Sequence, residues 1–110
     1  MPTDTALIVP AWVETDPCWV AALHVLQAPA LMAKGVMRHV DLQAREIDFP
    51  ALRRRARAWS DGERTLLAAA GALFGYLPGA ELRDLVADLD EDNLRRVIEA
   101  VRAYRGRGGR

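Results

Sequence analysis

Cysteine is almost absent from this sequence, in which Cys18 is the only one. A single thiol excludes a disulfide within the chain and a zinc site built from four thiolates. The absence of a disulfide framework is typical of proteins from a reducing compartment. The first residues, MPTDTALIVP, contain no basic side chain and only a short apolar run, which argues against a signal peptide. The sequence therefore predicts a cytoplasmic protein.

Long hydrophobic runs and net charge are also missing. No stretch reaches the roughly 20 apolar residues that span a bilayer, so we expect no contact with membranes. Lys and Arg number 15, and so do Asp and Glu, which leaves a net charge of zero. This balance argues against a protein whose whole surface binds nucleic acid. The charge is uneven, because acidic residues crowd positions 81–92 whereas arginines crowd 53–57 and 95–110.

The motifs of common enzyme classes are absent as well. The chain has no G-x-x-x-x-G-K-[ST] phosphate loop, no H-E-x-x-H metal motif and no G-x-S-x-G nucleophile turn. Cys18 and His24 are separated by a spacing that does not place both side chains on one face of a helix. We therefore predict a non-enzymatic protein with no catalytic residue, no metal site and no cofactor.

Apolar residues, by contrast, are plentiful at 51 % of the 110 residues, enough for the core of one domain. The centre of that domain is predicted at Trp59–Ala80, because no charged residue occurs from Thr65 onward in this stretch. Ser60 and Glu63 have the spacing of a capping box at a helix start. One face of the predicted helix is bulky, with Leu66, Leu67, Ala70, Leu73, Phe74 and Leu77. The other face is small, with Ala68, Gly71, Ala72 and Gly75.

Caps and apolar spacing predict further helices on both sides of this centre. Asp followed by Pro predicts helix starts at Asp16 and Asp48. Other helices are expected at about 29–38, 80–89 and 90–104. In the last two, the residues expected to face inward are Leu82, Leu85, Val86, Leu89, Leu94, Val97, Ile98, Val101 and Tyr104. The prediction is an all-α single domain over residues 1–104, a compact bundle of five or six helices. Residues 1–15 are expected to form an extended arm and residues 105–110 a disordered basic tail.

Tryptophan and small residues favour a function in protein interaction. Trp is common among residues that anchor interfaces, so Trp12 and Trp19 are candidate interface residues. Gly71 and Gly75 are four positions apart, and such pairs let a second backbone approach closely. The leading hypothesis is a helical protein-interaction or adaptor module that forms a homo-oligomer or docks on a partner protein.

Arginines support an alternative hypothesis. The helix that starts at Asp48 carries Arg53, Arg54, Arg55 and Arg57 opposite its apolar stripe. Together with the tail residues Arg105, Arg107 and Arg110, they can neutralise the phosphates of a nucleic acid. The other interpretation is a solvated basic face that balances the acidic 81–92 segment.

The second half of the chain also carries a pattern found elsewhere. It reads Trp59-Ser60-x-Gly62-Glu63-Arg64-x-Leu66, followed by Leu89-Asp90-x-x-Asn93 and Val97. In this it resembles short uncharacterised helical proteins of high-GC bacteria and their phages. The resemblance brings no activity and no functional residue with it.

Overall fold

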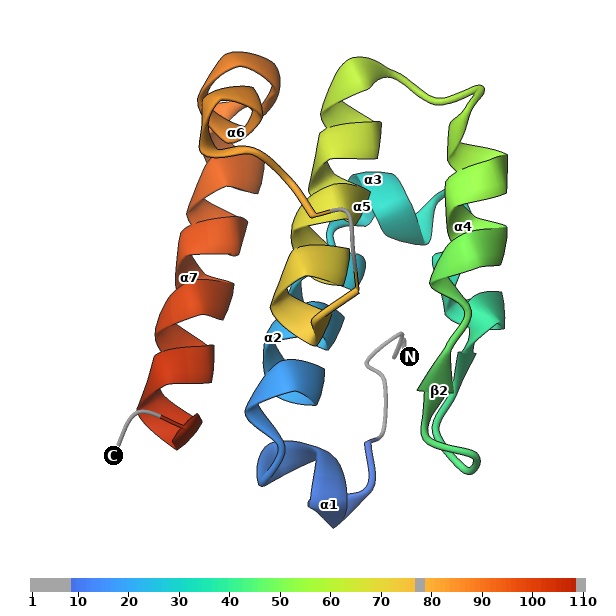
Figure 1. The fold of residues 1–110 in the computed structure, drawn as a ribbon, viewed down its shortest axis with the longest axis vertical. Coiled ribbons are helices and arrows are strands. Elements are labelled where there is room, and N and C mark those ends of the chain that lie inside the picture. The colour runs from blue at the N-terminus through green and yellow to red at the C-terminus, as the bar shows by residue number, and fades with distance from the viewer. Residues whose placement is uncertain (1–8, 77–78, 109–110) are drawn as a thin grey trace, which may run out of the picture.

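The chain folds into a bundle of α-helices with one small β-hairpin (Figure 1). The computed structural model describes residues 9–76 and 79–108, with the backbone alone for 107 and 108. In chain order the elements are α1 (Ala11–Glu14), α2 (Pro17–Leu26), α3 (Pro29–Met32), the 3₁₀ helix η1 (Val36–His39), β1 (Val40–Asp41), β2 (Glu46–Ile47), α4 (Phe49–Ala56), α5 (Asp61–Phe74), α6 (Leu82–Asp88) and α7 (Glu91–Gly108). The prediction of an all-α fold is confirmed.

Helix α2 packs against both α5 and α7 and begins where the sequence predicts. The carboxylate of Asp16 accepts hydrogen bonds from the amides of Cys18, at 3.0 Å, and Trp19, at 3.3 Å. Pro17 occupies the first helical position, where its missing N–H costs nothing. Because two helices cover α2, apolar residues recur around most of it. Its fully buried residues are Ala21, Ala22, Val25 and Leu26.

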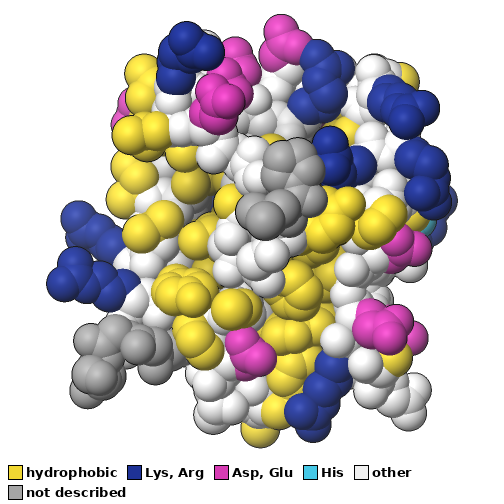
Figure 2. Space-filling model, in the orientation of Figure 1, with side chains coloured by type: hydrophobic (Ala, Val, Ile, Leu, Met, Phe, Trp, Pro, Cys, Tyr) yellow, Lys and Arg dark blue, Asp and Glu magenta, His cyan; other side chains and the backbone are white. Residues whose placement is uncertain are grey.

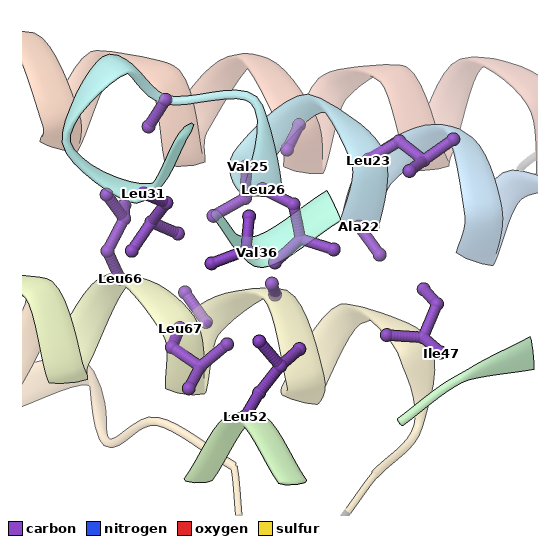
Figure 3. Close-up of a cluster of buried hydrophobic side chains, with 14 of the residues drawn as sticks. Ala22, Leu23, Val25, Leu26, Leu31, Val36, Ile47, Leu52, Leu66 and Leu67 are labelled. Carbon is purple, nitrogen blue, oxygen red and sulfur yellow. The ribbon is translucent and has the colours of Figure 1, made fainter. Parts of the chain in front are cut away.

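The core lies where α2 and α5 face each other (Figure 3). Val25 and Leu26 of α2 point toward Leu66 and Leu67 of α5 in that view. Leu52 of α4 closes the same cluster, and all of these side chains are at most 3 % exposed. Burial of such side chains is the main favourable term in folding, at roughly 1.5–3 kcal/mol each. The core therefore extends over both halves of the chain and is not limited to Trp59–Ala80.

The single helix predicted at residues 29–38 is divided in two. Helix α3 ends at Met32 and η1 begins at Val36, with Gly35 between them at a φ of +74°. A residue with a side chain rarely adopts this left-handed conformation, so glycine permits the chain to turn here. The turn lets Val36 return to the core, where it is fully buried.

A β-hairpin lies between the predicted helix at 29–38 and the predicted helix start at Asp48. Strands β1 and β2 pair antiparallel, with Val40 opposite Ile47. The carboxylate of Asp41 accepts hydrogen bonds from the amides of Gln43, at 3.0 Å, and Ala44, at 2.9 Å, which closes the turn. Strands of two residues are too short to produce the alternating pattern that identifies a strand in a sequence.

Helices α4 and α5 begin at the predicted caps. The carboxylate of Asp48 accepts a hydrogen bond from the Ala51 amide at 3.0 Å. At the start of α5, the Glu63 amide donates to Ser60 Oγ at 3.2 Å, and the Ser60 amide donates to Glu63 Oε1 at 3.0 Å. The two bonds together form the predicted capping box.

Both ends of the predicted domain need correction. Residues 11–14 of the expected extended arm form helix α1, in which Val13 is buried. Residues 1–8 of the arm lie outside the described residues. At the other end, α7 continues to Gly108, so the prediction of disorder from Arg105 is wrong for residues 105–108. Glycine lowers helix stability by about 1 kcal/mol relative to alanine, which is too little to stop a helix that is already formed.

Candidate functional site

Helix α7 is held against α2 along one side. Val97 and Ala100 are buried on that side. A guanidinium nitrogen of Arg96 donates to the carbonyl oxygen of His24 at 3.0 Å, and His24 Nε2 lies 2.9 Å from Glu99 Oε1. The hydrogen bond from His24 holds the pKa of Glu99 below its ordinary value. These contacts fix which side of α7 faces α2 and which side faces outward.

The outward side of α6 and α7 is apolar. Its exposed side chains are Leu82 (76 % exposed), Val86 (70 %), Ile98 (47 %), Val101 (49 %) and Tyr104 (38 %), and we call this set the α6–α7 face. Figure 2 shows hydrophobic side chains gathered along this side of the molecule, at the left of the view. The apolar spacing predicts that all five residues point inward, and this prediction is wrong. The reason is that α2 and α5 cover only part of the apolar side of α6 and α7.

Helix α6 contributes more to this face than to the core. None of its residues is buried, and Leu85 is its partly buried contact with the core. The Thr65 hydroxyl of α5 donates to the Asp88 carboxylate at 2.8 Å and so attaches the end of α6. Helices of this length are not stable alone in water, so α6 depends on these few contacts.

Charges of opposite sign flank the α6–α7 face. Helix α7 begins with Glu91 and Asp92 and carries Arg102 and Arg105 near its other end. Asp92 forms an ion pair with Arg95 at 3.4 Å. Among the described residues, no ion pair within 4.0 Å involves Glu91, Arg102 or Arg105. A hollow of about 270 Å³ continues the face between α7 and α5, beside Val101 and Tyr104.

The two tryptophans predicted as interface residues belong to the chain's own packing. Trp19 is 5 % exposed, and its ring contacts those of Trp12 and Phe74 edge-on, with centroids 5.0 and 5.2 Å apart. Trp12 is partly buried, and the guanidinium of Arg45 lies 4.6 Å from the centre of its ring. Trp19 is therefore closed to a partner, and Trp12 holds α1 against α2.

The small face of α5 is covered by the chain only in part, because Gly71 is buried whereas Ala72 and Gly75 are exposed. A Cβ built on Gly71 would lie 3.6 Å from the Tyr76 ring and 3.7 Å from the Phe49 ring. A Cβ on Gly79 would lie 2.7 Å from Ala72 Cβ, so the returning chain crosses α5 closely at this point. Gly75 has a different role, because it ends α5 with a φ of +89°. A second segment of the same chain thus approaches α5 closely at Ala72, whereas the neighbours of Gly71 are the rings of Phe49 and Tyr76.

The predicted basic face of α4 is divided by the structure. Arg53, Arg54 and Arg57 are exposed, whereas Arg55 is partly buried and donates from Nη2 to the Lys34 carbonyl at 2.6 Å. Helices α4 and α7 lie on opposite sides of the molecule (Figure 1), so Arg105 is remote from the α4 arginines. The side chain of Arg107 and the whole of Arg110 lie outside what the structure describes.

Cys18 and the histidines do not form a reactive cluster. The Cys18 thiol donates to Tyr104 Oη at 3.9 Å, which raises the pKa of Tyr104, and His24 is engaged by Glu99. Within residues 9–76 and 79–108, no group of three or more His, Cys, Asp and Glu side chains is placed to hold a metal ion. No helix in the described part of the chain has the length and hydrophobicity to cross a membrane.

Comparison with known proteins gave no relative. No family model, no curated protein and no solved structure matches this chain. The resemblance to short helical proteins of high-GC bacteria and phages therefore stays a prediction.

Proposed function

We propose that the protein is a small non-enzymatic interaction module that forms a homodimer through the α6–α7 face. The observation that carries the proposal is the distribution of exposed apolar side chains. Of the six large hydrophobic residues exposed in the described part of the chain, five belong to this face, and the sixth is Met32. Scattered exposed apolar residues are normal, whereas a gathering on two neighbouring helices is typical of an interaction site.

The charges of α7 favour a second copy as the occupant. Glu91, Ile98 and Arg105 follow one another at intervals of seven residues, which places them nearly in line along one side of the helix. In an antiparallel pair with a two-fold axis at Ile98, Glu91 of each copy lies beside Arg105 of the other. Neither residue forms an ion pair among the described residues, and this arrangement gives each of them a partner of opposite charge. Antiparallel helix dipoles add to the attraction.

The dimensions of the face are compatible with this pairing. Helix α7 has 18 residues and is therefore about 27 Å long. A standard interface covers roughly 800 Å² of each partner, which is about an eighth of the 6755 Å² surface of this chain. The hollow beside Val101 and Tyr104 offers a recess for a side chain of the partner. Helices α6 and α7 together are therefore long enough to form an interface of standard size.

Light scattering coupled to size exclusion tests the proposal over a range of protein concentrations. We expect the wild type to have twice the mass of the chain and Ile98→Glu to have the mass of one chain. Met32→Glu is the matched control, because Met32 is 37 % exposed and lies on α3, outside the face. It is expected to stay dimeric.

Charge exchange sharpens this test. Glu91→Arg is expected to weaken the dimer by placing like charges together, and the double variant Glu91→Arg/Arg105→Glu is expected to restore it. A wild type that is monomeric at every concentration, or an Ile98→Glu variant as dimeric as Met32→Glu, would refute the proposal.

Nucleic-acid binding is the less favoured candidate. It requires the arginines of α4 and of the C-terminal segment to contact one ligand, yet α4 and α7 lie on opposite sides of the molecule (Figure 1). Without the C-terminal arginines, those of α4 can still bind a single anionic group.

A further inference from the structure

A groove of about 550 Å³ lies between α4 and α5, on a part of the surface separate from the α6–α7 face. Its floor is apolar and includes Leu67, Ala68 and Gly71 of α5 and the ring of Tyr76. Four arginines also line the groove, and we call them its rim: Arg53, Arg54, Arg57 and Arg64. Figure 2 shows Lys and Arg side chains gathered over the upper right of the molecule, where α4 lies.

The positive charge of the rim is only partly neutralised by the chain. Arg64 pairs with Asp61 and donates to the carbonyl oxygen of Trp59. No ion pair involves Arg53, Arg54 or Arg57 within residues 9–76 and 79–108. Like charges this close along a short helix repel one another and favour the binding of an anion.

The floor is suited to an apolar group. The rings of Phe49 and Tyr76 stack with their centroids 5.3 Å apart and an angle of 17° between their planes. Gly71 packs against both rings, and the guanidinium of Arg53 lies 6.0 Å from the centre of the Tyr76 ring. One wall of the groove therefore combines an aromatic surface with a cation next to it.

We propose that this groove binds a small amphiphilic anion, with a carboxylate or phosphate head on the arginines of the rim and an apolar body along the floor. Guanidinium groups present paired N–H donors that match the oxygens of either head group. The volume lies within the range of roughly 300–1,000 Å³ that is usual for small-molecule sites. A nucleic acid needs charge along an extended path, whereas three of the four arginines that line the groove lie within residues 53–57, at the end of α4.

Isothermal titration calorimetry with the full chain tests the site. The probes are dodecanoate and dodecyl phosphate, each below the concentration at which it forms micelles. Dodecyltrimethylammonium tests whether the tail alone suffices, and inorganic phosphate tests whether the head alone suffices. We expect both anionic amphiphiles to bind at one site and both control probes to bind at least about tenfold more weakly.

Variants place that binding in the groove. Arg53→Gln/Arg57→Gln removes two exposed charges from the rim and is expected to weaken dodecanoate binding by about tenfold or more. Arg83→Gln, on exposed α6, is the matched control and is expected to bind as the wild type does. Ile98→Glu is also expected to retain binding, which separates this site from the α6–α7 face.

Three outcomes would overturn the proposal. The first is equal affinity for dodecanoate and dodecyltrimethylammonium. The second is unchanged dodecanoate affinity in Arg53→Gln/Arg57→Gln. The third is binding of a thymidine oligonucleotide, lost in that double variant and steeply weakened by salt, without binding of either anionic amphiphile. This last result would assign the groove to nucleic acid.

Discussion

Gly71 and Gly75, four positions apart in α5, serve different purposes. Gly71 is buried in the helix, and the space for a Cβ there is bounded by rings at ordinary van der Waals distances of 3.6–3.7 Å. Gly75 has the left-handed conformation that ends the helix, and no described atom lies within 4 Å of its Cβ position. Spacing in the sequence suggested one shared role, whereas backbone conformation separates the two residues.

Alanine substitution at these glycines is expected to have opposite effects. Gly71→Ala should raise the free energy of unfolding by about 0.5–1 kcal/mol, because alanine favours the helix and its methyl group fits. Gly75→Ala should lower it by about 1–2 kcal/mol, the cost of a left-handed alanine. Gly71→Leu should lower it by about 1–3 kcal/mol through overpacking against Phe49 and Tyr76. Urea denaturation monitored by circular dichroism measures all three, and changes of the same sign for both alanine variants would contradict the assignment.

At the scale of the element, α5 depends on its cap. The capping box satisfies two backbone N–H donors at the start of the helix, next to the charged turn that ends α4. Helix α5 in turn contacts α2, α4, α6 and α7, so loss of its first turn affects most of the bundle.

Ser60→Ala is therefore expected to lower the free energy of unfolding by about 1 kcal/mol. The alanine side chain cannot accept the hydrogen bond from the Glu63 amide that is seen at 3.2 Å. Ser60→Asp is the control, because aspartate is an equally good N-cap, and it should stay close to the wild type. Thermal unfolding measures the difference, and equal midpoints for Ser60→Ala and the wild type would show that the cap has no effect.

Helix α6 shows the limit of apolar spacing as a guide to burial. Leu82, Leu85, Val86 and Leu89 recur at helical intervals, and the helix forms as predicted. Spacing identifies which residues share a side of a helix, but it does not show how much of that side another element covers. The chain partly covers Leu85 of α6 and Leu89 directly after it, and it leaves Leu82 and Val86 exposed.

At the scale of the whole molecule, two carboxylates link stability to pH. Hydrogen bonding to the Ser60 amide lowers the pKa of Glu63, and the bond from His24 lowers that of Glu99. A carboxylate whose pKa is lower in the folded state binds protons less readily there than in the unfolded chain. Its contribution to stability is therefore complete above the unfolded pKa of about 4.3 and is lost as the pH falls through the lowered value.

Replacing both carboxylates should flatten this acid dependence. Glu63→Gln/Glu99→Gln keeps side chains that can form hydrogen bonds but cannot be protonated in this range. The free energy of unfolding of the wild type should fall more steeply below about pH 5 than that of the variant. Urea denaturation at a series of pH values compares the two slopes. Equal slopes would show that these groups do not couple folding to protons.

The sequence by itself determined the features that arise from neighbouring residues. The caps at Asp16, Asp48 and Ser60, the helical class and the buried stripe of α4 were predicted because their hydrogen bonds and spacings span only a few positions. Gly35 permits the left-handed turn that divides the helix predicted at residues 29–38.

Only the tertiary structure decided which surfaces remain open. Trp19 is covered by Trp12 and Phe74, and Gly71 by Phe49 and Tyr76, through contacts between residues distant in the sequence. The same packing leaves Ile98 and Val101 exposed and brings the arginines of α4 and Arg64 of α5 around one groove. Apolar residues have the same local pattern whether a partner element covers them or not. Their exposure depends on where the other helices lie, and the local pattern does not contain that information.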